Sequence, residues 1–338
     1  MLGTCLASLL DCNDRTDDHE IIVVDNASTD GTRDLVEEAT AHYPDRKIRY
    51  LYESVPGAMA ARHRGAFDAR GDVCAFLDDD VSVGTDWING LQDAFRDPDV
   101  VLVGGPSRPK FEIGPPRWVS AFYKENESGR SCGWLSLFDG GNRIKEIDPL
   151  YVWSLNFAIR RKAFFDLDGF HPDLVPEALQ RFQGDGETGL TMKVARAGLK
   201  AIYHRNVCVL HHIPSSRLTP EYFGQRAFFQ GVADSYSQIR AVGRPRPVRD
   251  FHSWQDALRP IKWFLEAAHA KNIEIYRIKS LTDQAYRAGF QFHQESIRED
   301  PSLLEWVLRK HYWDYRFPET VHNSEPDTAF NLVVRSLP

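Results

Sequence analysis

The sequence predicts an α/β protein: a mostly parallel sheet flanked by helices, followed by a C-terminal helical extension. Short apolar runs alternate with helical patterns from residue 20 to residue 104, which is typical of βαβ units. Carboxylates directly follow two of these runs, and beyond residue 250 amphipathic helical patterns take over. We therefore expect an α/β domain at residues 1–240 and a helical extension at residues 241–338.

The elements of the first hundred residues follow from apolar runs and turn residues. Ile21–Val24 is predicted as a buried strand, and the turn cluster Asn26–Gly31 leads to Thr32, which can cap a helix to about residue 39. Further strands are expected at 48–52, 73–77 and 100–103, and further helices at 58–69 and 86–95. Gly71 closes the first of these two helices, and Thr85 starts the second.

Residues 106–149 break this alternation with glycine, proline and aromatic residues, and we expect a loop that covers a pocket. Order returns with strands at 153–159, 200–203 and 207–210 and a helix at 187–197. The GRPRP segment at 243–247 is typical of a linker. Amphipathic helices are expected at 254–270, 275–298 and 303–312.

Composition excludes several classes of protein. With 338 residues, 42% hydrophobic and 26% charged, the chain can bury a sizeable core and is predicted to be globular and soluble. No stretch approaches the roughly 20 apolar residues of a membrane span, and the first ten residues lack a secretory pattern. We expect a cytoplasmic protein, with peripheral membrane contact left open. Five cysteines without a CxxC pair argue against a disulfide framework or a zinc site, and a net charge of -7 argues against non-specific nucleic-acid binding.

Acidic residues follow two predicted strands. Asp25 comes directly after Ile21–Val24, and Asp78, Asp79 and Asp80 come after Val73–Leu77. Like charges this close repel each other unless a cation or hydrogen-bond donors hold them, so the triplet indicates a metal site. Ligands of open α/β sheets bind outside the carboxyl ends of the strands. If both strands belong to one parallel sheet, both acidic groups face the same crevice.

Six sequence elements, in this order and spacing, resemble the family 2 glycosyltransferases, which have the GT-A (Rossmann-like) fold. The elements are CLASLL at 5–10, EIIVVDNASTDGT at 20–32, PGAMAARHRGAFDARGDVCAFLDDDV at 56–81, NFAIRR at 156–161 with DGF at 168–170, GDGETGL at 184–190 and VCVLHH at 207–212. The resemblance covers residues 5 to about 230. It implies that residues 1–240 form the catalytic domain of a glycosyltransferase.

The resemblance also implies a donor site for a nucleotide-diphosphate sugar linked to UDP, GDP or dTDP. Its nucleotide-sugar-binding candidates are Asp25, Asn26, Asp30, Arg62, Asp78 and Asp79. Asp25 corresponds to the residue that contacts the base, and the DXD motif falls on Asp78 and Asp80. The implied metal ligands are Asp80, Asp78 and His211, which suit Mn²⁺ or Mg²⁺. Carboxylate-held metal would offset the charge that develops on the leaving diphosphate. Arg217 is a further phosphate candidate.

In the family that this sequence resembles, the catalytic base is usually an aspartate in an acidic pair just before a helix. Alignment on Leu190 places Glu187 at the base position and Gly186 where the preceding acid usually lies, which is a departure from the pattern. Glu187 is the preferred base, and Asp185 remains the alternative. The resemblance implies an inverting transfer to an acceptor hydroxyl of a glycan, a lipid-linked compound or a small molecule.

Other interpretations remain beside this one. The chain carries no QxxRW motif, so a non-processive transferase is expected. The family usually begins with a strand before the CLASLL helix, and we expect a truncated or misassigned start. A nucleotidyltransferase on a similar scaffold, or a catalytically impaired nucleotide-sugar-binding homologue, are the competing hypotheses. The C-terminal helices are predicted to serve acceptor binding or self-association as a homo-oligomer.

Overall fold

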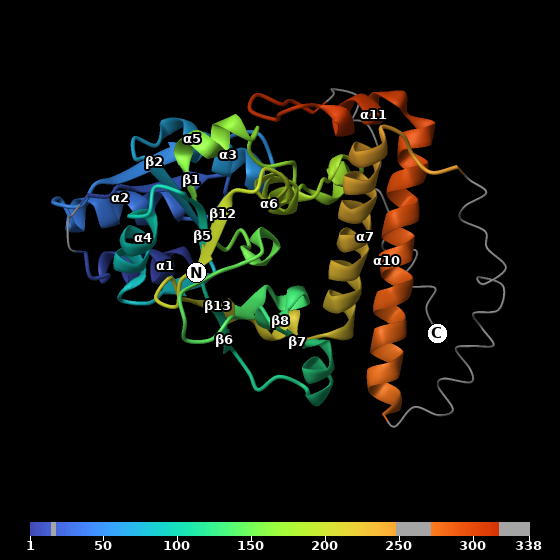
Figure 1. The fold of residues 1–338 in the computed structure, drawn as a ribbon, viewed down its shortest axis with the longest axis horizontal. Helices are drawn as coiled ribbons and strands as arrows, with labels where there is room; N and C mark the ends of the chain where they lie inside the picture. Colours follow the sequence, from blue (N-terminus) through green and yellow to red (C-terminus); the bar gives the residue numbers. More distant parts are fainter. Residues whose placement is uncertain (15–17, 248–271, 318–338) are drawn as a thin grey trace.

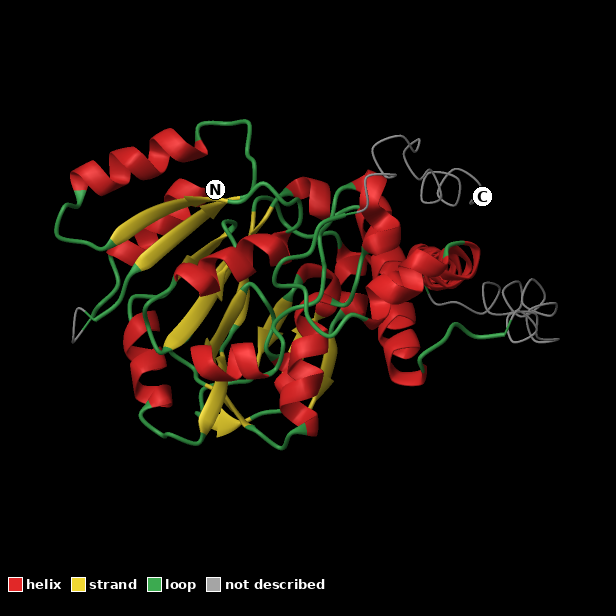
Figure 2. Cartoon of the chain, turned by 90° about the horizontal axis from the view of Figure 1, so that it is seen from above, coloured by secondary structure: helices red, strands yellow, loops and turns green. Residues whose placement is uncertain are grey.

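A computed structural model describes residues 1–14, 18–247 and 272–317 of the chain (Figure 1). It confirms the α/β class, because three β-sheets are flanked by helices and a helical region follows toward the C-terminus. Figure 2 shows the long helices gathered at one side of the sheet-containing part. The predicted helix at 254–270 lies outside the described residues. The domain boundary at residue 240 stays a prediction.

The N-terminal part is a two-stranded parallel sheet packed against helices. Its elements are α1 (Leu2–Leu10), β1 (Ile21–Asp25), α2 (Thr32–His42), β2 (Ile48–Tyr52) and α3 (Ala58–Asp68). β1 and β2 pair in register from Ile21 opposite Ile48 to Asp25 opposite Tyr52. Apolar side chains of α1 and α2 pack with those of the sheet, among them Leu6, Val36 and Ile48. The strand ends, and with them Asp25, are thereby held beside the start of α3.

A five-stranded mixed sheet forms the centre of the molecule. Its order is β10 (Lys145–Glu146), β12 (Lys200–Tyr203), β5 (Val100–Gly104), β11 (Asn156–Arg160) and β3 (Val73–Leu77). Only β12 and β5 run parallel; the other pairs are antiparallel. Among the described residues β1 and β3 lie in different sheets, so the condition under which both acidic groups would lie at one edge of a parallel sheet is not met. β3 pairs with β11 and β1 pairs with β2, and no described strand bridges the two.

A third sheet corrects the prediction of a loop at residues 106–149. Its order is β4 (Val81–Val83), β13 (Val209–Ile213), β6 (Ser107–Phe111), β9 (Leu137–Asp139), β8 (Gly129–Cys132) and β7 (Lys124–Asn126). Short 3-10 helices η1 (Arg117–Phe122) and η2 (Gly133–Leu135) connect strands of this sheet, and η3 (Pro149–Tyr151) lies between β10 and β11 of the central sheet. The strands are too short to show an apolar period, and long-range pairing with β13 stabilises them.

Three helices cover the central sheet, and its interior is rich in aromatic side chains. They are α4 (Trp87–Phe95), α5 (Arg161–Asp166) and α6 (Gly186–Arg196). Phe76, Phe157, Phe164 and Phe170 pack with one another at ring-centroid distances of 5.0–6.2 Å. Such clustered rings give the strand ends a stiff support. The site residues therefore project from well-packed elements.

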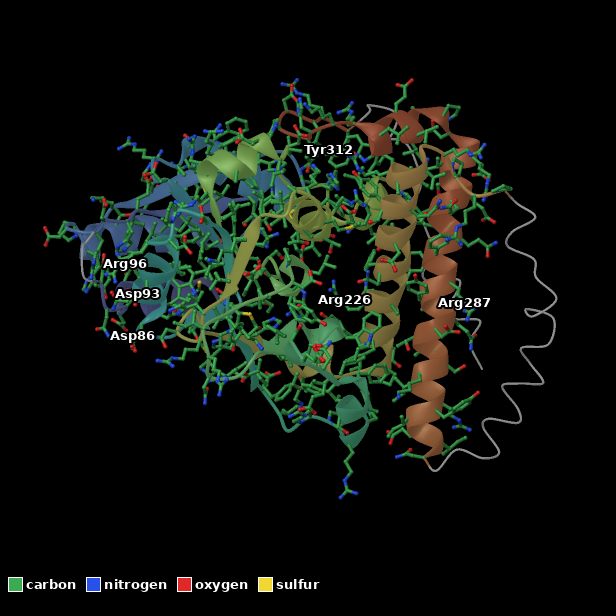
Figure 3. All side chains as sticks on the ribbon, viewed as in Figure 1. Asp86, Asp93, Arg96, Arg226, Arg287 and Tyr312 are labelled. Atoms are coloured by element: carbon green, nitrogen blue, oxygen red, sulfur yellow. The ribbon has the colours of Figure 1, made fainter. Side chains whose placement is uncertain are left out.

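Three helices of the described residues form the C-terminal side: α7 (Pro220–Val242), α10 (Ile273–Glu299) and α11 (Pro301–Leu308). They meet the α/β part through the 3-10 helix η4 (Glu177–Phe182), where the Trp306 indole donates to the Phe182 carbonyl at 3.0 Å. Tyr312 lies near the end of α7 (Figure 3), and its carbonyl contacts His63 Nδ1 of α3 at 3.2 Å. None of the described helices is long and apolar enough to cross a bilayer.

Candidate functional site

The three carboxylates that follow β3 have different surroundings. Asp78 forms an ion pair with Arg62 of α3, whose side chain is only 10% exposed. Asp79 is exposed, and the surrounding protein together with repulsion from Asp80 and Asp78 raises the pKa of its carboxyl. Asp80 is buried. Within the triplet, Asp78 is therefore ion-paired, Asp79 is exposed to solvent and Asp80 is buried.

Asp80 lies against His211 of β13 and Arg217 of η5 (Ser215–Arg217). β13 pairs with β4 so that His211 is opposite Val81, which brings the imidazole next to Asp80. His211 Nε2 is 3.3 Å from Asp80 Oδ2, and Arg217 Nη2 donates to the same oxygen at 2.8 Å. His211 Nδ1 lies 2.9 Å from the Leu135 carbonyl. Since a carbonyl only accepts, Nδ1 donates to it, and Arg217 Nη1 lies 2.8 Å from Nε2.

The Asp80 side chain has one buried oxygen, Oδ1, with no hydrogen-bond partner among the described residues. Burial disfavours the charged form, but His211 and Arg217 outweigh it and hold the pKa of Asp80 below its usual range. An ionised carboxylate with an unused oxygen beside an imidazole nitrogen fits a divalent cation. Asp78 is turned to Arg62, and the described residues contain no group of three His, Cys, Asp or Glu that could hold a metal.

The residues expected at the nucleotide lie after β1. Asp25 is buried and accepts from the Ser28 amide at 2.8 Å and the Tyr50 hydroxyl at 2.7 Å. Burial opposes its charge, but these hydrogen bonds outweigh burial and lower the pKa of Asp25. Each carboxylate oxygen of Asp25 has a further lone pair that can accept a hydrogen bond from a ligand.

The neighbours of Asp25 have structural partners in the chain. Asn26 donates to the carbonyls of Glu53 and Val55 and accepts from the Gly57 amide at 2.9 Å, so it fastens the loop before α3. Asp30 is exposed and accepts from the amide and hydroxyl of Thr32, the first residue of α2. These contacts orient the loop and helix around Asp25.

Glu187 lies in the first turn of α6 and is half-buried. Burial and repulsion from Asp173 raise the pKa of its carboxyl to about 7, and the nearby Arg62 opposes this rise. Because Arg62 also pairs with Asp78, one guanidinium links the acidic triplet to Glu187. A carboxylate that titrates near neutral pH is suited to general acid–base chemistry.

Asp185, the alternative base, precedes α6 and is fully enclosed. One oxygen accepts from His171 Nδ1 at 2.5 Å and the other accepts from the Ser237 hydroxyl of α7. Burial opposes its charge, but His171 and Ser237 outweigh it and lower the pKa of Asp185. Its contacts therefore join α6 to the segment before η4 and to α7.

Asp173 is a residue that motif reasoning missed. Gly186 has a φ of +55°, and a Cβ atom there would lie 2.5 Å from Asp173 Oδ2. The departure at Gly186 has a physical reason, because Asp173 fills the space that a side chain at 186 would need. Asp173 stands in a proline-flanked turn, HPDLVP, and that turn gives no periodic signal of its position.

Comparison with known proteins shows to which family and fold the sequence is similar. The sequence model described as "Glycosyl transferase family 2" matches residues 1–168. Residues 1–168 therefore carry a glycosyltransferase family 2 domain. A mannosyltransferase from Pyrobaculum calidifontis, solved in complex with GDP-Man and Mn²⁺, shares its fold with a TM-score of 0.50 at 19% identity. That likeness covers 92% of this chain and 83% of the other, and it confirms the expected GT-A fold.

Two curated relatives match part of the chain. A glucosyl-dolichyl phosphate glucuronosyltransferase of Haloferax volcanii is 26% identical over 194 residues, 56% of this chain and 58% of its own length. A pre-mycofactocin glycosyltransferase of Mycobacterium tuberculosis is 29% identical over 182 residues, 52% of this chain and 34% of its own length. The chain thus spans less than two thirds of either relative.

Proposed function

We propose that this family 2 chain transfers a sugar from a nucleotide-diphosphate sugar to an acceptor hydroxyl, with a divalent metal and inversion at the sugar carbon. The observation that carries the proposal is Glu187, a half-buried carboxylate whose pKa is raised to about 7. It is coupled through Arg62 to the acidic triplet at the end of β3. A base and a donor-phosphate site are the two parts that such a transfer needs.

The donor side of the proposed site combines Asp25 with the residues after β3. Asp25 would accept a hydrogen bond from the base, with Asn26 and Asp30 holding its loop in place. In this proposal Asp78 and Asp79 would bind hydroxyls of the sugar and the ribose, and Arg62 and Arg217 would supply positive charge for the diphosphate. The neighbour solved with GDP-Man and Mn²⁺ supports a nucleotide sugar as donor.

The proposed metal ligands are Asp80 and His211, with Asp78 available only if its pairing with Arg62 opens. Asp80 Oδ1 has no hydrogen-bond partner within the described residues, and His211 Nε2 lies 3.3 Å from Oδ2 of the same carboxylate, so these two residues fit Mn²⁺ or Mg²⁺. When bound, such an ion supplies charge that stabilises the leaving diphosphate. Arg217, which now pairs with Asp80, can then turn toward the phosphates.

In the proposed reaction Glu187 accepts the proton of the acceptor hydroxyl. The acceptor oxygen forms a bond to the anomeric carbon, and the bond from that carbon to the diphosphate oxygen breaks on the opposite side. The nucleoside diphosphate leaves with the electron pair. We prefer Glu187 to Asp185 as base because both oxygens of Asp185 are already hydrogen-bonded inside the protein. General base catalysis typically contributes about 10²–10⁴-fold.

Adjacent histidines provide a matched test of the metal site. His211 Nε2 faces Asp80, whereas His212 Nε2 contacts the Ser82 hydroxyl at 3.0 Å. We expect His211→Gln to weaken Mn²⁺-dependent binding of UDP or GDP by at least about 10–100-fold, the scale on which even outer-shell partners of a metal act. His212→Gln should bind like the unmodified chain. Isothermal titration with and without Mn²⁺ measures both.

The activity itself is measured as release of nucleoside diphosphate from a panel of UDP-, GDP- and dTDP-sugars. If nucleotide binding depends on Mn²⁺ equally in His211→Gln and His212→Gln, the assignment of His211 as a metal ligand is refuted. An unmodified chain that neither binds nor cleaves any of these donors, with or without Mn²⁺, would refute the transferase as a whole.

A further inference from the structure

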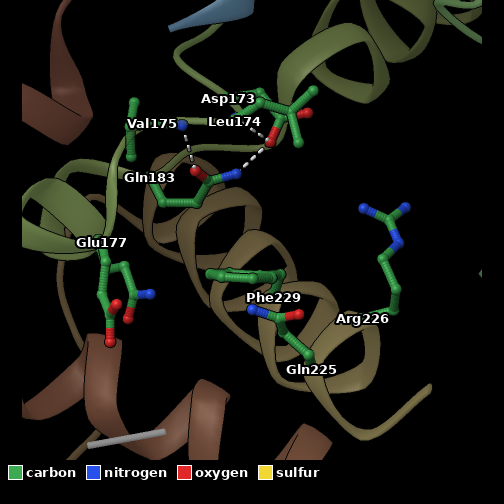
Figure 4. A pocket seen from close by; sticks show the side chains of 9 residues that line it. Asp173, Leu174, Val175, Glu177, Gln183, Gln225, Arg226 and Phe229 are labelled. Atoms are coloured by element: carbon green, nitrogen blue, oxygen red, sulfur yellow. Dashed lines mark hydrogen bonds between the residues drawn. The ribbon is translucent and has the colours of Figure 1, made fainter. Parts of the chain in front are cut away.

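A cavity of about 390 Å³ lies beside α6, between the 173–183 segment and α7 (Figure 4). Its volume falls within the roughly 300–1,000 Å³ of small-molecule sites. Asp173, Leu174 and Val175 form one wall, and Gln225, Arg226 and Phe229 of α7 form the facing wall. Arg226 lies on the side of α7 that faces the sheets (Figure 3).

Two buried polar atoms of this cavity have no hydrogen-bond partner within the described part of the chain: Arg226 Nε and Gln180 Oε1. Gln180 is only 4% exposed. Leaving such atoms unpaired is costly, so a bound polar molecule would satisfy them. Gln183, in contrast, is fixed by Val175 and Asp173 and serves as a rigid wall (Figure 4).

The lining has the chemistry of carbohydrate recognition. Amide groups of Gln180 and Gln225 and the Arg226 guanidinium can pair with hydroxyls as acceptors and donors, while the half-buried Phe229 ring offers a flat face to C–H groups. The charge of Arg226 acts on Asp173, so an anionic ligand would have to compete with that carboxylate. The lining therefore favours a neutral hydroxylated ring over an acid.

The cavity lies close to the proposed base. Asp173 lines it, and the same carboxylate lies against Gly186, directly before Glu187. We propose that the cavity binds the acceptor as a neutral saccharide and presents one of its hydroxyls to Glu187. This inference rests on the proposed sugar transfer and adds the chemical class of the acceptor.

Methyl glycosides of glucose, mannose and galactose are the probes, with glucuronate as the acidic comparison. Saturation-transfer NMR on the full chain detects binding, and titration with UDP or GDP plus Mn²⁺ reports on the donor site separately. Gln225→Ala and Phe229→Ala alter the cavity. Gln230→Ala is the matched control, because Gln230 is an exposed α7 glutamine outside the lining.

We expect at least one methyl glycoside to bind, and more tightly than glucuronate. Gln225→Ala should weaken that binding about fivefold, the usual effect of losing one hydrogen bond. Phe229→Ala should weaken it further, and Gln230→Ala should bind normally. Absence of glycoside binding, equal loss in Gln230→Ala, or preference for glucuronate overturns the inference. If glycoside binding is absent but the chain still cleaves a nucleotide sugar, only this inference fails and the proposed function stands. If the chain neither binds nor cleaves any nucleotide sugar, the proposed function fails as well.

Discussion

Three carboxylates around the start of α6 have different roles because their partners differ. Asp185 has both oxygens hydrogen-bonded in the interior, whereas Glu187 lies half-buried with its pKa raised to about 7. Asp173 lines the cavity next to α7 and lies against Gly186, directly before Glu187. Although Asp185 and Glu187 are only two positions apart in the sequence, Asp185 therefore stabilises the packing of α6 while Glu187 is the proposed base.

Substitution separates these two roles. Glu187→Gln should retain donor binding and lower kcat by about 10²–10⁴-fold, because the proton acceptor is lost. Asp185→Asn should instead lower the free energy of unfolding by about 2 kcal/mol, since a charged hydrogen-bond acceptor is lost inside the protein. Urea denaturation and steady-state kinetics measure the two effects. The opposite pattern, turnover lost in a fully stable Asp185→Asn chain, would make Asp185 the base.

The pH profile of kcat should depend on Asp173. Glu187 acts as a base only when ionised, so kcat should fall with decreasing pH around pH 7. Asp173→Asn removes a negative charge that raises the pKa of Glu187, so this fall should move to lower pH. Glu177→Gln, an exposed residue of the same cavity, is the control and should leave the profile unchanged. If kcat of Asp173→Asn falls at the same pH as kcat of the unmodified chain, the effect of Asp173 on the pKa of Glu187 is contradicted.

Among the elements, strand β13 and the α7–α10 helix pair show how local pattern and packing cooperate. Along β13, Val209, His211 and Ile213 are buried while Leu210 is exposed, so strand alternation selects His211 rather than its neighbour for the site. α7 and α10 approach closely where glycines stand. A Cβ atom at Gly231 would lie 1.9 Å from the Tyr286 carbonyl oxygen.

This close packing predicts a difference between two glycines of α7. Gly231→Ala should lower the free energy of unfolding by about 1–3 kcal/mol, because the added methyl group overpacks the contact with α10. Gly224→Ala is the control, since its Cβ would meet Leu281 only at 3.6 Å or beyond. It should be neutral or stabilising by up to about 1 kcal/mol through helix propensity. Chemical denaturation compares them; equal effects would contradict the packing argument.

At the scale of the whole molecule, the C-terminal helices and the α/β part share buried contacts. Tyr312 and Trp313 contact His63 of α3, and Tyr312 hydrogen-bonds to Tyr236 of α7 at 2.7 Å. Inside the helix pair, His293 contacts the Ser235 hydroxyl at 2.8 Å. Both histidines are buried in the contact regions that hold the parts together.

These buried histidines predict loss of stability in mild acid. Burial lowers the pKa of His63 and of His293 from 6.5 to about 3. Below pH 6.5 the unfolded chain therefore binds more protons than the folded chain, and stability falls as pH falls. Between pH 7 and pH 5 we expect a loss of about 2 kcal/mol for each histidine. Urea denaturation at several pH values measures this; unchanged stability at pH 5 would contradict it.

The sequence alone determined the elements of residues 20–104 apart from the short strand β4, the acidic triplet at the end of β3 and the resemblance to the family. Those features depend on apolar period, turn residues and motif spacing, which neighbouring residues encode. Tertiary structure decided which strands share a sheet, what Asp80 contacts and how Asp185 differs from Glu187. Those outcomes depend on groups far away in sequence, such as Arg217 for Asp80 and Ser237 for Asp185, and no local pattern encodes their distances.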